Sequence, residues 1–220
     1  MNKKALLDLV LLLIVFWTSW YFRSYIQIEF QGAFVIIITS LVSLLIIRLR
    51  GIDYKSIGFT KLKFNESFLK KVAFVSLLIL AIWCIGIIII GLLFGFPDES
   101  LAVTTQPKSV LGFILDNIFM VWIITALGEE FIFRGIIINR LNELLETINS
   151  NKKIYVISLF QAIWFGLVHQ SQGLSGIIIT GLIGFGLGLY ILKNKKSGLW
   201  PLIVGHGLID TFILTLNFIF

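Results

Sequence analysis

The chain of 220 residues is 58% hydrophobic and only 14% charged, with a mean hydropathy of +0.98. Soluble domains contain about 45–50% apolar and about 25% charged residues, so the composition excludes an ordinary soluble domain and indicates an integral membrane protein. The net charge of +6 could suggest a nucleic-acid partner. However, the basic residues gather in loops on one predicted side of the membrane, as the positive-inside rule describes. We therefore expect no nucleic-acid partner and a lipid bilayer with anionic lipid as the counter-charge.

The apolar stretches, taken in chain order, are long enough to cross a membrane, which requires about 20 residues. The first follows Lys3 and Lys4 and could pass for a signal peptide, but no small-residue cleavage site follows it, so a retained helix is expected. The predicted fold is all-α, a polytopic helical membrane protein whose single transmembrane domain covers residues 1–220. The seven predicted spans are 5–22, 31–47, 72–96, 118–139, 154–172, 174–192 and 199–220.

The distribution of charge also predicts an orientation. The loop 48–71 is rich in Lys and Arg, which places it and the N-terminus in the cytoplasm, and residues 97–108 outside. The abundance of Ile, Lys and Asn is typical of an AT-rich bacterial genome. We expect a multi-pass protein of a bacterial cell membrane.

The fourth predicted span contains three charged residues in the sequence ALGEEFIFRG, residues 126–135. Charges at the centre of a transmembrane helix cost about 2.5–3.5 kcal/mol each, so Glu129, Glu130 and Arg134 together cost about 8–10 kcal/mol. Glu130 and Arg134 are four residues apart and can form an ion pair, whereas Glu129 points about 100° away and has no basic partner in its helix. The charges could simply lock helices together. A free carboxylate in a poorly hydrated site is also what a general base requires.

Two later spans contain the only histidines of the chain, each four residues from a possible partner on the same helix face. Phe165 precedes His169, and His206 precedes Asp210. A lone histidine in a membrane helix often serves packing, but ionisable groups on three spans are candidates for a functional site. Together they could deprotonate a water molecule and stabilise a developing oxyanion.

The order of these motifs resembles one known group of proteins. E-E-x-x-x-R at Glu129, F-x-x-x-H at Phe165 and H-x-x-x-[N/D] at His206 are similar to the motifs of the CAAX protease and bacteriocin-processing family, also called CPBP or Abi, whose members are intramembrane proteases. The stretch SGLWPLIVGHGLID also resembles the family's entry into its last motif. The resemblance implies a catalytic core of roughly 110–220, with the site between helices 4, 5 and 7.

The resemblance also implies roles. Glu129 would be the catalytic base and would hold the attacking water with His169, while Glu130 and Arg134 would orient the site and Phe165 would support it. His206 and Asp210 would stabilise the oxyanion. Eukaryotic prenyl-protein members have Asn at the last position, so Asp210 must either stay protonated or act indirectly by orienting His206.

Zinc offers an alternative chemistry, in which Glu129, His169, His206 and Asp210 would be the ligands. The chain has no H-E-x-x-H motif, and the family's structural group is now regarded as glutamate-dependent. We therefore expect no metal cofactor.

The predicted function is intramembrane endopeptidase activity on a membrane-associated peptide or protein, such as a peptide pheromone or bacteriocin. One alternative is a non-catalytic immunity or regulatory protein of the same fold. The other is a proton-coupled transporter, although the sequence shows no inverted repeat of the usual kind.

Two structural expectations complete the interpretation. The glycines of the sixth span, including Gly184 and Gly188, predict close helix packing. At about 1.5 Å per residue, His169 lies about 22 Å along its span but His206 only about 10 Å along its own. Tilt, a fifth helix that begins outside the lipid, or a break near Pro201 could bring the histidines to one depth.

Overall fold

The computed structural model describes residues 2–25, 31–94, 107 and 109–219, and within these ranges all regular structure is helical. The long helices are α1 (Lys3–Phe22), α2 (Gln31–Arg50), α3 (Glu66–Phe94), η3 (Asp116–Ile137), α6 (Ser150–Leu167), α7 (Gly173–Lys193) and α8 (Trp200–Ile219). The short ones are η1 (Arg23–Tyr25), α4 (Val110–Leu115), α5 (Ile138–Leu144), η4 (Gln170–Gln172) and η5 (Lys195–Ser197). The π-helix η3 continues from α4 and into α5, so that Val110–Leu144 is one long helix.

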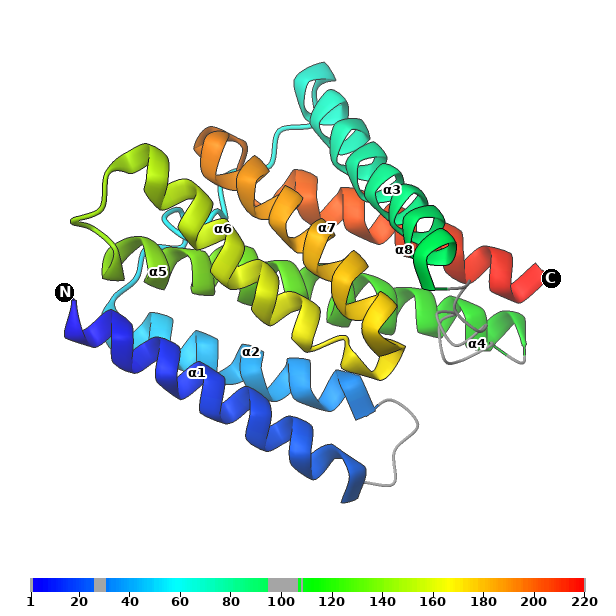
Figure 1. Cartoon of the computed structure of the whole chain (residues 1–220), viewed down its shortest axis with the longest axis horizontal. Helices are drawn as coiled ribbons and strands as arrows, with labels where there is room; N and C mark the ends of the chain where they lie inside the picture. Colours follow the sequence, from blue (N-terminus) through cyan, green and yellow to red (C-terminus); the bar gives the residue numbers. More distant parts are fainter. Residues whose placement is uncertain (1, 26–30, 95–106, 108, 220) are drawn as a thin grey trace.

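The long helix that contains η3 runs through the middle of the bundle (Figure 1). α2 and α8 pack along it, α1 lies beside α2, and α3 crosses α7 and α8. α6 and α7 form an antiparallel hairpin that covers η3 (Figure 1). In the C-terminal half of η3 the side chains are surrounded by helices, and every residue from Gly128 to Ile138 is buried. The N-terminal half is more open, with Ile118, Phe119 and Ile123 exposed.

Six helices of the described chain are long and apolar enough to cross a membrane, in agreement with the predicted all-α polytopic fold. They are Lys3–Phe22, Gly32–Arg50, Glu66–Leu93, Val110–Leu144, Gln170–Lys193 and Trp200–Ile219. The chain is thus a multi-pass membrane protein. The predicted span 154–172 is not among them, because α6 begins with Asn151, Lys152 and Lys153 and ends at Leu167. The predicted outer loop 97–108 lies almost entirely outside the described residues.

Glycines bring α6 and α7 into close contact, which confirms the packing predicted for the sixth span. A β-carbon at Gly184 would lie 3.0 Å from the Phe165 ring and 3.3 Å from the backbone of Ala162. A β-carbon at Gly166 would lie only 2.5 Å from the carbonyl oxygen of Ile177. Because these backbones nearly touch, the hairpin is held as one unit.

An aromatic cluster joins this hairpin to the other half of the bundle. Phe16 of α1, Phe133 of η3 and Trp164 of α6 make mutual edge-to-face contacts, with ring centroids 5.9–6.4 Å apart. Such arrangements stabilise by about 0.5–1.5 kcal/mol per pair beyond the area they bury. The cluster fixes α1 and α6 against η3.

A partly buried ionic cluster, which the sequence analysis did not predict, connects the helix ends near the N-terminus. Asp8 accepts hydrogen bonds from Nε and Nη2 of Arg50 at 2.8–3.2 Å. Arg140, 3% exposed, lies 3.5 Å from Asp8 and donates to Glu143 at 2.6 Å. Asn2 in turn donates to Glu143. We call these five residues the end cluster; it connects α1, α2 and α5.

Candidate active site

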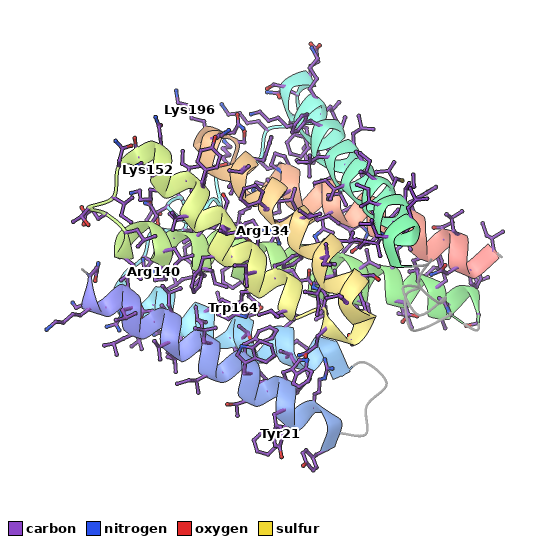
Figure 2. All side chains as sticks on the ribbon, in the orientation of Figure 1. Tyr21, Arg134, Arg140, Lys152, Trp164 and Lys196 are labelled. Atoms are coloured by element: carbon purple, nitrogen blue, oxygen red, sulfur yellow. The ribbon has the colours of Figure 1, made fainter. Side chains whose placement is uncertain are left out.

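Three elements contribute the ionisable side chains that the sequence analysis singled out, and they correspond to the predicted helices 4, 5 and 7. The central helix η3 provides Glu129, Glu130 and Arg134, the turn after α6 provides His169, and α8 provides His206 and Asp210. Figure 2 shows Arg134 in the interior of the bundle, between the crossing helices.

Glu130 and Arg134 form the predicted ion pair. Arg134 Nη1 lies 3.2 Å from Glu130 Oε1, and both side chains are completely buried. The guanidinium also lies over the ring of Phe165, with its central carbon 4.1 Å from the ring centroid. Cation–π contacts of this kind are worth about 2 kcal/mol when desolvated. Phe165 therefore supports Arg134 from α6, across the helix interface.

His206 lies between two carboxylates. Its Nδ1 donates to Glu130 Oε1 at 3.0 Å, and its Nε2 lies 3.3 Å from Asp210 Oδ2. The His206–Asp210 contact follows from the i,i+4 spacing in α8, whereas the contact with Glu130 joins residues 76 positions apart. Glu130 thus holds both Arg134 and His206.

His169 lies just beyond the end of α6 and is fixed by its own turn. Its Nδ1 is 2.8 Å from the carbonyl oxygen of Phe165, and its ring contacts the Phe165 ring at a centroid distance of 4.8 Å. Because a carbonyl only accepts hydrogen bonds, Nδ1 carries the proton. In the neutral ring, Nε2 is then an acceptor available to a water molecule.

Glu129 differs from its neighbour. It is buried, and its Oε2 has no hydrogen-bond partner among the described residues. It interacts electrostatically with His206, Asp210 and Arg134. Oε2 of Glu130 and the three guanidinium nitrogens of Arg134 likewise lack hydrogen bonds in this part of the chain. Buried polar atoms are almost always bonded, so this cluster has the capacity to bind water or a substrate carbonyl.

The two histidines are close enough to interact electrostatically, despite their different positions along their helices. α8 is a continuous helix with Pro201 in its first turn, so a break near Pro201, one of the three alternatives, does not occur. Instead, α6 begins farther out along the bundle than α8 does (Figure 1). The polar first turn of α6, with Asn151, Lys152 and Lys153, is suited to that outlying position.

Contacts that the sequence analysis missed hold α8 against η3. Thr211, which follows Asp210 in the chain, donates from its hydroxyl to the side-chain oxygen of Asn117 at 2.9 Å. A β-carbon at Gly207 would lie 2.8 Å from the Trp122 ring, so only glycine allows this approach. The available signal for this pair was a polar residue inside the last predicted span, Thr211, and another directly before the fourth, Asn117.

Residues 109–212 match the sequence profile of the type II CAAX prenyl endopeptidase Rce1-like family. The match includes every residue of the cluster and confirms the resemblance to CAAX-type proteases of the membrane. Neither the curated proteins nor the solved structures contain a significant match to the chain.

Zinc was the alternative for the motif residues of this Rce1-like segment. Within the described ranges, no three His, Cys, Asp or Glu side chains are arranged to hold a metal ion. Both ring nitrogens of His206 face carboxylates, and Nδ1 of His169 faces a backbone carbonyl. The arrangement therefore does not fit a preformed zinc site, and the choice between zinc-bound and carboxylate-activated water stays a prediction.

Proposed function

We propose that the protein is an intramembrane endopeptidase that hydrolyses a peptide bond in a membrane-associated peptide or protein. The observation that supports this most strongly is the contrast between adjacent carboxylates in a buried site. Glu130 is held by Arg134 and His206, while Glu129 has a buried oxygen without a partner. An unpaired carboxylate in a buried site is suited to accept a proton from water.

In the proposed reaction, the Glu129 carboxylate and Nε2 of His169 accept hydrogen bonds from one water molecule. Glu129 takes a proton as the water oxygen attacks the scissile carbonyl carbon, which forms a tetrahedral oxyanion. The same proton then passes to the amide nitrogen as the C–N bond breaks, which releases an amine and a carboxylic acid; the acid then loses its proton to water. Proton transfer by a positioned side chain contributes about 10²–10⁴-fold to such a reaction.

His206 is the proposed donor to the oxyanion. Nδ1 is occupied by Glu130, so the donor is the N–H at Nε2, which faces Asp210 before substrate arrives. Of the two roles expected for Asp210, the 3.3 Å contact supports the indirect one, in which the carboxylate orients the imidazole. A preorganised donor of this kind typically contributes about 10²–10³-fold.

Glu130 and Arg134 act as positioning residues in this proposal. Glu130 fixes His206 across the interface between η3 and α8, and Arg134 fixes Glu130 within η3. Phe165 extends the chain of contacts to the α6 turn that holds His169. One set of contacts therefore positions both histidines relative to Glu129.

The test is peptide cleavage by the purified chain in lipid nanodiscs, with wild type compared with Glu129→Gln. The panel includes a C-terminally prenylated peptide, the class implied by the family's name, and unmodified membrane peptides. Comparative proteomics of membrane peptides from cells with either form identifies natural substrates. Glu66→Gln, at an exposed ion pair, is the matched control. Equal peptide profiles for wild type and Glu129→Gln would support the non-catalytic immunity or regulatory alternative.

A further inference from the structure

A basic pocket lies where α3 begins, α7 ends and α8 begins. It has a volume of about 150 Å³ and is lined by Lys61, Lys63, Lys71 and Lys196, with Trp200 at its wall. No acidic side chain lines it among the described residues. We call this cavity the lysine pocket. Figure 2 shows Lys196 at the outer edge of the bundle, far from Arg134 in the interior.

The segment that contributes two of the lysines is fixed in place. The indole N–H of Trp200 donates to the Thr60 carbonyl at 2.9 Å, and the Leu199 N–H donates to the Gly58 carbonyl at 2.8 Å. On the other side, Asn65 caps α3 by accepting from the Phe68 N–H at 2.9 Å. The backbone that carries Lys61 and Lys63 is therefore held in place between α3 and α8.

The charges of the lysine pocket are not neutralised by the protein. Neighbouring Lys70 has a partner, Glu66, at 2.6 Å. None of the four pocket lysines forms an ion pair with a described residue, although they come from three separate segments. Like charges gathered in one cavity repel each other, so a bound anion would stabilise the arrangement.

The surroundings of the pocket indicate which kind of anion fits. The ends of three apolar helices meet there, and Phe64, which is 77% exposed, and Trp200 are residue types enriched at membrane interfaces. A second cavity of about 450 Å³ shares Ser67 and Lys71 with the pocket. Its lining is mostly polar, with Glu66, Lys70 and Asn194, and its aromatic side is formed by Phe74 and Tyr190, whose rings stack with centroids 5.6 Å apart.

We propose that the lysine pocket binds the phosphate of an anionic phospholipid, with a hydrocarbon chain lying along the groove beside Phe74. The pocket accommodates the charged group, and the exposed ring of Phe74 offers an apolar contact for the hydrocarbon chain of the same molecule. Basic pockets between transmembrane helices are suited to anionic head groups. This lipid site is separate from Glu129 and does not depend on the proposed peptidase activity.

The test is lipid binding measured by native mass spectrometry of the full chain in detergent. The probes are phosphatidylglycerol, phosphatidylcholine, glycerol 3-phosphate and an acidic peptide. The test variant replaces the four pocket lysines (K61Q/K63Q/K71Q/K196Q), and the control makes the same change of charge elsewhere (K3Q/K55Q/K152Q/K153Q). Circular dichroism verifies that both variants keep the helical content of wild type.

We expect one phosphatidylglycerol per chain with higher affinity than the others, and phosphatidylcholine bound at least tenfold more weakly. The pocket variant should lose about tenfold or more in affinity for phosphatidylglycerol, since each lysine near a membrane surface contributes measurably. The control variant should stay within about twofold of wild type. Equal losses in both variants would show a general effect of surface charge and overturn the proposal. Glycerol 3-phosphate binding as tightly as the lipid, or an acidic peptide competing for the pocket at similar affinity, would overturn the lipid assignment.

Discussion

The protein contains a partly buried ionic cluster at the helix ends and a fully buried one at its centre, and the two differ in how completely their charges are hydrogen-bonded. In the end cluster, Asp8 receives three hydrogen bonds from Arg50, and Arg140 is bonded to both Asn139 and Glu143. In the central cluster, Glu129, Glu130 and Arg134 all have buried polar atoms without a hydrogen bond among the described residues. A satisfied cluster fastens helices, whereas an unsatisfied one has capacity for a ligand or a reaction. In the proposed function, the chemistry therefore belongs to the cluster whose hydrogen bonding is incomplete.

Glu129→Gln should produce the largest effect, a loss of about 10²–10⁴-fold in the rate of peptide cleavage, because a positioned base contributes that much. Thermal stability should remain that of wild type, since no described residue is bonded to the side chain. Cleavage kinetics and a thermal unfolding curve in the same detergent measure both. Unchanged kcat would remove Glu129 from the reaction and reverse the proposed difference between the clusters.

Glu130→Gln should reduce activity and stability together. The substitution removes the charge that partners Arg134 and His206, and breaking a buried ion pair costs about 3–5 kcal/mol. The expected result is a lower midpoint of unfolding, a lower protein level and slower cleavage. If Glu129→Gln and Glu130→Gln unfold at the same temperature, the proposed division of roles between the two carboxylates is wrong.

Asp8→Asn should destabilise the protein without altering its chemistry. Hydrogen bonds to charged groups contribute about 1.5–3 kcal/mol to the free energy of unfolding. Because Arg50 is partly exposed, water can solvate its guanidinium when the charge of Asp8 is removed. The unfolding midpoint should fall while kcat per folded molecule stays constant. The control is Glu66→Gln, whose exposed pair should contribute only about 0.3–0.5 kcal/mol. A fall in kcat of Asp8→Asn at full folding would show that the end cluster also takes part in function.

Removal of metal ions by a chelator is expected to have the smallest effect on the rate of peptide cleavage. If Glu129 activates water directly, dialysis against a strong chelator should leave the cleavage rate unchanged. Elemental analysis before and after dialysis, alongside the cleavage assay, measures this. About one zinc per chain, lost and restored in step with activity, would establish a metal-dependent protease instead, because metal binding and function would then be linked.

The sequence predicted what depends on local spacing. Hydropathy identified the helices, and i,i+4 spacing identified three pairs that the structure contains: Glu130–Arg134, Phe165–His169 and His206–Asp210. It did not predict the contact of His206 with Glu130 or the placement of Phe165 against Arg134. Such contacts depend on how each helix is rotated and how far it is shifted against its neighbour, and hydropathy carries no information about either.

The sequence does contain a signal for the end cluster. Asp8 is an ionisable residue within the first apolar span, and Arg50 and Arg140 lie at the ends of two others. A charge in such a span predicts a partner on another helix, and positively charged helix ends were the available candidates. The depth of His169 could not be predicted from the sequence, because it depends on where α6 begins relative to α8.

The close contact between α6 and α7 at Gly166 determines where His169 lies. The Gly166 carbonyl accepts a hydrogen bond from the His169 backbone N–H at 3.0 Å, and the Ile177 carbonyl occupies the place where a β-carbon of residue 166 would be. One added methyl group would act as a wedge between α6 and α7 and move the tip of the hairpin away from η3. The position of His169 relative to Glu129 therefore depends on the absence of a side chain at Gly166.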